Sequence, residues 1–190
     1  MSIWYNLAGG CMKRHLMQSL IDWKDSSFRK PLILQGARQV GKTYLINEYG
    51  REHNTVNDNF EMETKMSEVF ERDLHPDRIL RQLQYLSGQT ILPEKTLLIF
   101  DEVQACEAAL TSLKYFNEEA NQYHIVATGS YMGIAMTRKH FSFPVGKVDM
   151  LQLYPMDFKE FLLALNEDAL VKQIEDSYHN HEKLIDSIHN

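Results

Sequence analysis

The chain has 190 residues and 44% of them are hydrophobic, which is enough for one compact domain without a metal or disulfide staple. Its 26 acidic and 20 basic residues argue weakly against a surface built as a whole to hold nucleic acid. Only two cysteines occur, Cys11 and Cys106, which favours a reducing cytoplasm. No apolar run approaches the ~20 residues of a membrane helix.

The first predicted elements are a helix and a strand. Leu16, Leu20 and Trp23 mark the apolar face of the helix. The strand is the run Pro31-Leu32-Ile33-Leu34, and it leads into a segment that fits the P-loop pattern G-x-x-x-x-G-K-[ST]. That segment is Gly36-Ala37-Arg38-Gln39-Val40-Gly41-Lys42-Thr43, with Tyr44 next in a helix predicted over residues 42–50.

The P-loop pattern predicts a nucleotide site, because its glycines let the backbone turn tightly and aim successive N–H groups at phosphate oxygens. Lys42 would reach the β- and γ-phosphates, and the Thr43 hydroxyl would ligate Mg²⁺. Trp23, Phe28 or Arg29 could approach the adenine, although core packing explains Trp23 better.

A second strand is predicted over residues 55–60, with Asn59 at its polar end. Two helices that cover the sheet, with no implied chemistry, are predicted next, one before and one after the following strand in the chain. Their predicted apolar faces are Ile79, Leu80, Leu83 and Leu86 behind Pro76, and Ala109, Leu113, Phe116 and Ala120.

The strand between these helices, residues 96–100, ends in Asp101 and Glu102, as in a Walker B element. Asp101 is predicted to hold Mg²⁺, usually through water, because Mg²⁺ prefers hard oxygen ligands and keeps part of its hydration shell. Glu102 is the candidate base that polarises the attacking water, which favours hydrolysis over transfer to another acceptor. Asn59 could contact Glu102 and restrain it until a partner binds.

Another buried strand is predicted over residues 123–127, and it runs into Thr128-Gly129-Ser130. A hydroxyl at a strand tip can bond the γ-phosphate or the attacking water, and Thr128 and Ser130 both remain candidates for this sensor role. A fifth strand follows near residues 148–153. It precedes a helix with the capping box Asp157 and Glu160 and the apolar face Phe158, Phe161, Leu162 and Leu165.

This alternation predicts an α/β fold in which helices cover both faces of a parallel sheet. Ligands of such sheets bind beyond the carboxyl ends of the strands, where every candidate residue falls. Cys106 is predicted to pack at a helix start. The segment His179-Asn180-His181, with His189, lacks a recognisable zinc spacing, and no N-K-x-D guanine-reading tetrad follows the Walker elements.

These ordered motifs resemble the prokaryotic AAA-like ATPases of the AAA+ superfamily that carry a C-terminal domain of unknown function. The resemblance covers residues 12–165 and implies a P-loop NTPase three-layer sandwich with strand order 5-1-4-3-2, ATP binding and ATPase activity. Beyond the P-loop and its strand, it rests on Asn59-Phe60-Glu61, Phe100-Asp101-Glu102-Val103-Gln104, Gly129-Ser130, Phe143-Pro144-Val145-Gly146-Lys147-Val148 and the segment from Leu153 to Leu162.

Members of that family look about twice as long as this chain. Residues 12–165 are therefore expected to form the ATP-binding domain, and residues 166–190 to begin a truncated C-terminal region. Residues 1–11 are expected to be an extra N-terminal segment or an expression scar.

Three functions remain open at this point. The leading one is ATP binding with Mg²⁺-dependent hydrolysis that drives a downstream effector domain. The others are a nucleotide-dependent regulatory module with little turnover and a P-loop phosphotransferase. Neither Arg38, inside the loop, nor Arg138 is a convincing donor of positive charge to the γ-phosphate. Turnover is therefore expected to be slow unless an arginine comes from the missing C-terminal half or from a neighbouring subunit. The expected partners are ATP and either further copies of the chain in a homo-oligomer or an unknown protein.

Overall fold

A five-stranded parallel sheet forms the centre of the larger of two compact units in the computed structural model, which describes residues 13–51, 53–62, 64–130 and 143–181. The strand order is β2-β3-β4-β1-β5, and all neighbours are parallel. This is the predicted order 5-1-4-3-2 read from the other edge, so the predicted fold is confirmed. The strands are β1 (Leu32–Gln35), β2 (Asn54–Asn59), β3 (Thr96–Asp101), β4 (His124–Gly129) and β5 (Asp149–Gln152).

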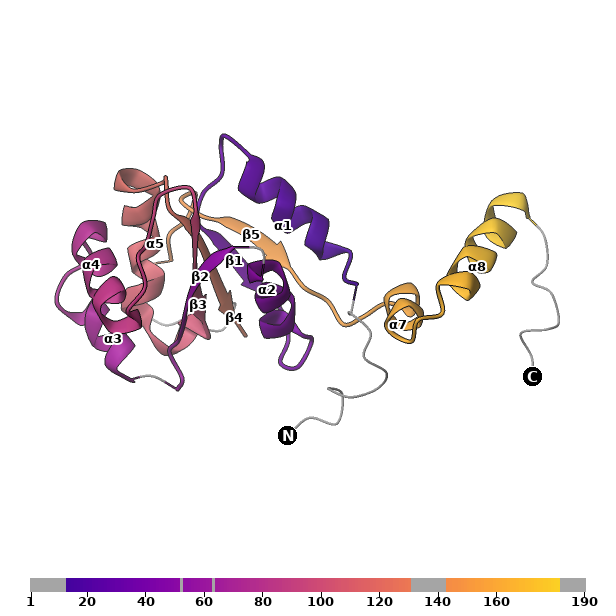
Figure 1. The fold of residues 1–190 in the computed structure, drawn as a ribbon, viewed down its shortest axis with the longest axis horizontal. Helices are drawn as coiled ribbons and strands as arrows, with labels where there is room; N and C mark the ends of the chain where they lie inside the picture. Colours follow the sequence, from indigo (N-terminus) through magenta and orange to yellow (C-terminus); the bar gives the residue numbers. More distant parts are fainter. Residues whose placement is uncertain (1–12, 52, 63, 131–142, 182–190) are drawn as a thin grey trace. The chain divides into compact units, whose positions relative to one another are not determined.

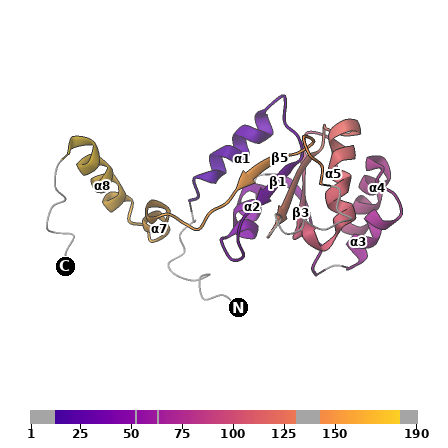
Figure 2. The same ribbon diagram turned by 180° about the vertical axis from the view of Figure 1, so that it is seen from behind.

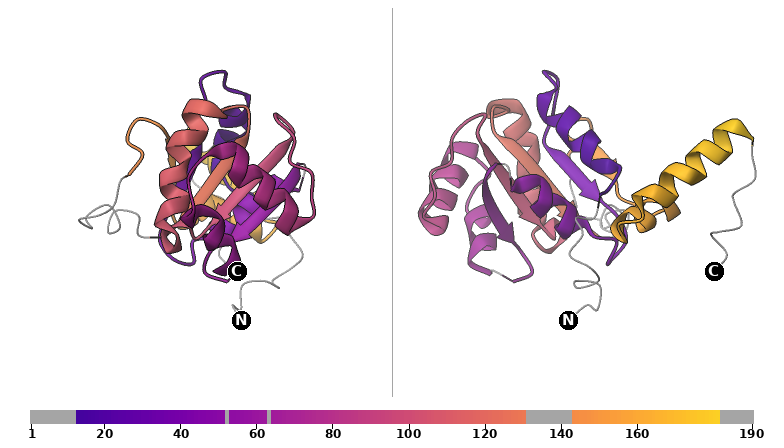
Figure 3. Two further views of the ribbon diagram at one scale, coloured as in Figure 1. Left: turned by 90° about the vertical axis from the view of Figure 1, so that its left-hand side faces the viewer. Right: turned by 45° about the vertical axis from the view of Figure 1, so that its right-hand side comes forward.

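Helices cover both faces of this sheet, which belongs to the unit Gln18–Pro155 (Figure 1). Seen from the front and from behind, α3, α4 and α5 pack together on one side, and α1 and α2 lie on the other (Figures 1 and 2). The right-hand view of Figure 3 shows the same three layers. The elements are α1 (Leu16–Asp25), α2 (Lys42–Gly50), α3 (Thr64–Glu71), α4 (Pro76–Ser87), the 3₁₀ turn η2 (Val103–Ala105) and α5 (Glu107–Glu119). Helix α3 was not predicted from the sequence.

The two faces of the sheet are buried because alternate side chains of each strand point to opposite sides. Ile33, Leu98 and Phe100 belong to the large apolar cluster that includes the residues of α3, α4 and α5. Ile99 faces the other way, toward Gly50 of α2. Trp23 is buried, as predicted, and its indole Nε1 donates to the Lys30 carbonyl at 2.8 Å. No helix in the described ranges is long and apolar enough to cross a membrane.

The smaller unit joins the residues up to Met17 with those from Met156 onward. It contains α7 (Phe158–Ala164), which begins with the predicted capping box of Asp157 and Glu160, and α8 (Asp168–Asn180). The predicted apolar face of α7 is only partly buried: Leu162 is buried, whereas the other three members are exposed to between 40% and 66%. Those three are Phe158, Phe161 and Leu165.

Candidate functional site

The P-loop connects β1 to α2 in a conformation that depends on its glycines. A Cβ added at Gly36 would lie 2.4 Å from the Leu153 carbonyl oxygen, so a side chain there would force the backbone to move. Gly41 has a φ of 94°, in the left-handed region that favours glycine, and it caps α2. Gln39 also has a positive φ of 64°. The tight turn places the start of α2 beside the carboxyl end of β1, as the pattern predicts.

Lys42 is buried, with 5% of its surface exposed, and its ammonium is held inside the loop. Its Nζ donates to the Gly36 carbonyl at 3.0 Å, to the Ala37 carbonyl at 2.9 Å and to the Ser130 hydroxyl at 2.8 Å. An ammonium has three N–H donors, so these three neutral oxygens match its full capacity. Burial lowers the pKa of Lys42, an effect opposed by the negative charges of Glu102 and Asp101.

Asp101, at the end of β3, is a buried carboxylate that collects three donors. Its Oδ2 accepts from the Thr43 hydroxyl at 3.3 Å and from the Asn59 amide at 3.1 Å. Its Oδ1 accepts from the Thr128 hydroxyl at the end of β4. The P-loop, β2 and β4 therefore converge on one carboxylate at the carboxyl edge of the sheet. Thr43, Asp101 and Thr128 are the residues that the sequence motifs predict at this edge.

The Asn59 amide donates to Asp101, so the predicted contact between Asn59 and Glu102 is wrong. The physical reason is register: Asn59 is the cross-strand partner of Asp101 in the pairing of β2 with β3. Glu102 lies one residue beyond the strand and has a φ of 54°, which takes it out of the sheet. The Asn59 side-chain oxygen accepts from the backbone N–H groups of Glu61 and Met62.

Glu102 accepts a hydrogen bond from Gln104, a residue for which the sequence motifs predict no role. The Gln104 amide donates from Nε2 to Glu102 Oε2 at 2.5 Å and accepts through Oε1 from the Ser130 backbone N–H at 3.3 Å. The Glu102 backbone N–H donates to the Thr128 hydroxyl at 3.3 Å. A bifunctional amide two residues after the acidic pair was the signal available in the sequence.

The remaining aromatic and basic candidates lie in other environments. Phe28 is 88% exposed, and Arg29 forms an ion pair with Glu94 at 3.3 Å. The Arg38 guanidinium is mostly exposed and lies 4.0 Å from the Glu61 carboxylate. Arg138 and His189 lie outside the described residues. Cys106 packs in the core at the start of α5, and burial raises the pKa of its thiol.

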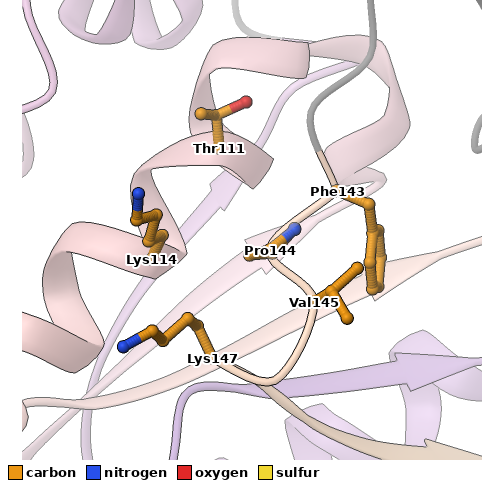
Figure 4. Close-up of a pocket in the computed structure, with 6 residues that line it drawn as sticks. All are labelled: Thr111, Lys114, Phe143, Pro144, Val145 and Lys147. Carbon is orange, nitrogen blue, oxygen red and sulfur yellow. The ribbon is translucent and has the colours of Figure 1, made fainter.

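The part of the chain that is described contains no group of three or more His, Cys, Asp and Glu side chains able to hold a metal. A cavity of about 310 Å³ lies between α5 and the segment before β5, away from the P-loop (Figure 4). It is lined by Thr111, Lys114, Phe143, Pro144, Val145 and Lys147.

Residues 28–162 match the family model described as an AAA domain, and the chain belongs to this family. An uncharacterised protein of Haemophilus influenzae is 27% identical over 179 residues, which are 90% of this chain but 42% of that protein. The chain thus spans less than half the length of this relative.

Solved structures share the fold at low sequence identity. The Walker-type ATPase PABY2304 of Pyrococcus abyssi superposes with a TM-score of 0.55 and 16% identity, covering 93% of this chain and 61% of that one. A chain in the structure of Drosophila ORC bound to DNA gives 0.54 and 11%, covering 85% and 48%. Family and fold together define an AAA+ ATPase-like P-loop domain, the class that the sequence motifs predicted.

Proposed function

We propose that this chain binds ATP with Mg²⁺ at the P-loop and hydrolyses it. The observation that carries the proposal is the buried Lys42 ammonium, whose three donors are matched by neutral oxygens at the carboxyl edge of the sheet. A buried cation gains most from an anionic partner, and a phosphate oxygen that replaces one of these acceptors would supply it. Thr43 and Tyr44 lie in the first turn of α2, and the backbone N–H groups at a helix N-terminus favour the same anion.

The residues present fit a magnesium ion in their chemistry. The Thr43 hydroxyl and the Asp101 carboxylate offer hard oxygen ligands and lie within hydrogen-bond distance of each other. Asp101 already accepts three hydrogen bonds, which favours a water-mediated role for it. When bound, Mg²⁺ would offset negative charge on the β- and γ-phosphate oxygens.

Glu102 is the proposed general base. It would take a proton from water as the water oxygen bonds to the γ-phosphorus and the bond to the β–γ bridging oxygen breaks, releasing ADP and phosphate. Ser130 is the stronger candidate for contact with the γ-phosphate, because its hydroxyl already bonds Lys42, whereas the Thr128 hydroxyl bonds Asp101. We infer that the nucleotide cycle drives an effector region of a longer protein.

A regulatory module with little turnover is the second candidate. The environment of the loop arginine favours this candidate. Among the described residues, Arg38 has a mostly exposed side chain that pairs with Glu61, so it is not held toward the nucleotide site. An arginine from a second copy or another protein would then be needed for rapid hydrolysis, a contribution of 10³ to 10⁵ in rate in related systems. A phosphotransferase, the third possibility, requires an acceptor and is disfavoured by Glu102.

The decisive experiment combines nucleotide binding with single-turnover phosphate release. ATP and GTP are titrated with and without Mg²⁺, and phosphate release is followed for the parent, Glu102→Gln and Asp101→Asn over a wide range of protein concentration. We expect Mg²⁺-dependent ATP binding, slow release that rises with concentration, retained but unhydrolysed ATP in Glu102→Gln, and weaker Mg²⁺-dependent binding in Asp101→Asn.

Other outcomes would redirect the proposal. Binding without release at any concentration would support the regulatory module. Release from Glu102→Gln as fast as from the parent would remove Glu102 from the role of base. Label transferred from ATP to an added acceptor, without free phosphate, would indicate the phosphotransferase. Absence of nucleotide binding would refute all three.

A further inference from the structure

Gln104 lies between Glu102, the proposed base, and Ser130, the proposed contact to the γ-phosphate. It belongs to the short turn η2, just after the Walker B strand, and it is partly buried. Its amide uses both ends: the NH₂ group donates to the Glu102 carboxylate, and the oxygen accepts from the Ser130 N–H. Because one neighbour is an acceptor and the other a donor, the two contacts fix the orientation of the amide.

The same Ser130 also contacts the phosphate-binding lysine. Its hydroxyl accepts from Lys42 at 2.8 Å, while its backbone N–H contacts Gln104. A continuous path of hydrogen bonds therefore runs from Lys42 through Ser130 and Gln104 to Glu102. The path joins the residue that would hold the phosphates to the residue that would activate water.

Glu102 needs such support because its backbone does not supply it. The residue follows β3 at a φ of 54°, outside the sheet register, and its side chain is only partly buried. A glutamate side chain that is free to rotate loses rotamer entropy when it is fixed. A base held about 1 Å too loosely is a common cause of poor catalysis.

We propose that Gln104 is a positioning residue that holds the Glu102 carboxylate for hydrolysis while leaving nucleotide affinity unaffected. This inference rests on the proposed ATPase function. Gln104 contacts Glu102 through Oε2, so Oε1 stays available to accept a proton from water. Removal of the amide should therefore act on kcat and not on binding.

The test uses two substitutions at the same position and one matched control. Gln104→Met keeps the length of the side chain but removes both hydrogen bonds. Gln104→Glu replaces the donor to Glu102 by a second carboxylate. Gln89→Met is the control, because Gln89 is an exposed glutamine outside the site. Single-turnover kcat and the Kd for ATP are measured for each, together with the thermal midpoint.

Gln104→Met should lower kcat at least tenfold with the ATP Kd within twofold of the parent. Gln104→Glu should also lower kcat, because a carboxylate at this position offers Glu102 no donor. Gln89→Met should match the parent. Unchanged kcat in Gln104→Met would overturn the inference while the ATPase proposal stands, and so would unchanged kcat in Gln104→Glu. A parent that binds ATP but never releases phosphate would refute the ATPase proposal and this inference with it.

Discussion

Two buried cations, one in each compact unit, are satisfied in different ways. In the smaller unit, the Arg14 guanidinium contacts the Glu160 carboxylate at 3.1 Å, and both side chains are less than 10% exposed. In the larger unit, the Lys42 ammonium donates to two carbonyl oxygens and one hydroxyl oxygen. A paired charge is complete within the fold, whereas a cation that contacts neutral oxygens still gains from an anion. The contrast separates a charge used for structure from one available to a ligand.

The Arg14 pair should show the largest effect when one partner is removed. Arg14→Met leaves the Glu160 carboxylate buried without its cation, and loss of one partner of a buried pair costs about 3 to 5 kcal/mol. The helix α7 depends on Glu160, which accepts from the His15 and Asp157 N–H groups. Hydrogen exchange of the α7 amides should therefore accelerate by more than a hundredfold.

Arg14→Lys is the matched control, because it keeps the charge and should keep most of the protection of α7. Equal exchange in the parent and in Arg14→Met would mean that the pair contributes little to the smaller unit. Arg14 would then no longer serve as the example of a buried cation that stabilises the fold.

His124 sharpens the comparison, because it is a buried ionisable group that remains neutral. It begins β4, with Trp23 against its ring, and Glu94, Arg29, Lys24 and His53 supply the surrounding charge. Burial, helped by the charge of Arg29, lowers the pKa of His124 to about 4 despite the attraction of Glu94. In the unfolded chain His124 binds a proton below about pH 6.5, whereas in the folded chain it binds one only near pH 4. The free energy of unfolding therefore decreases as pH falls from about 6.5 to 4.

The expected loss from His124 is on the order of 2 to 3 kcal/mol over that interval, with the full contribution present above pH 6.5. Urea denaturation of the parent and of His124→Leu at a series of pH values isolates it as the difference between the two slopes. Parallel curves for the two proteins would show that His124 does not titrate in this range.

Lys42→Ala tests whether the Lys42 ammonium binds the phosphates of ATP. The substitution removes a charge-assisted contact to phosphate, which is worth roughly 1.5 to 3 kcal/mol, so calorimetry should show ATP·Mg²⁺ affinity at least tenfold weaker. The loss of stability should be about 1 to 3 kcal/mol, since buried carbonyl and hydroxyl acceptors lose their donor. Lys95→Ala is the control, because this exposed lysine precedes the opposite end of β3. A large loss of stability with unchanged affinity would make Lys42 structural.

The sequence predicted the fold well because hydrophobic runs and Walker motifs report local constraints. The strand bounds agree within one or two residues, and the face of α5 at Ala109, Leu113 and Phe116 is buried as expected. It predicted less where the answer depends on register between strands. The contact of Asn59 with Glu102 is predicted by analogy with polar residues at that place in some AAA-like enzymes, yet cross-strand pairing selects Asp101. No local pattern predicts the role of Gln104, because its partner Ser130 is 26 residues away.

Asn59→Ala should produce the smallest effect and addresses that correction directly. The substitution removes one donor from Asp101 and two acceptor contacts in the following turn, so we expect a loss of about 1 kcal/mol in the free energy of unfolding. If Asn59 restrained Glu102, its removal would free the base and raise the rate of ATP hydrolysis. The contact with Asp101 predicts instead a modest weakening of Mg²⁺-dependent binding and no gain in rate. Single-turnover phosphate release at saturating Mg²⁺ distinguishes the two, because only a restrained Glu102 predicts faster release from the variant.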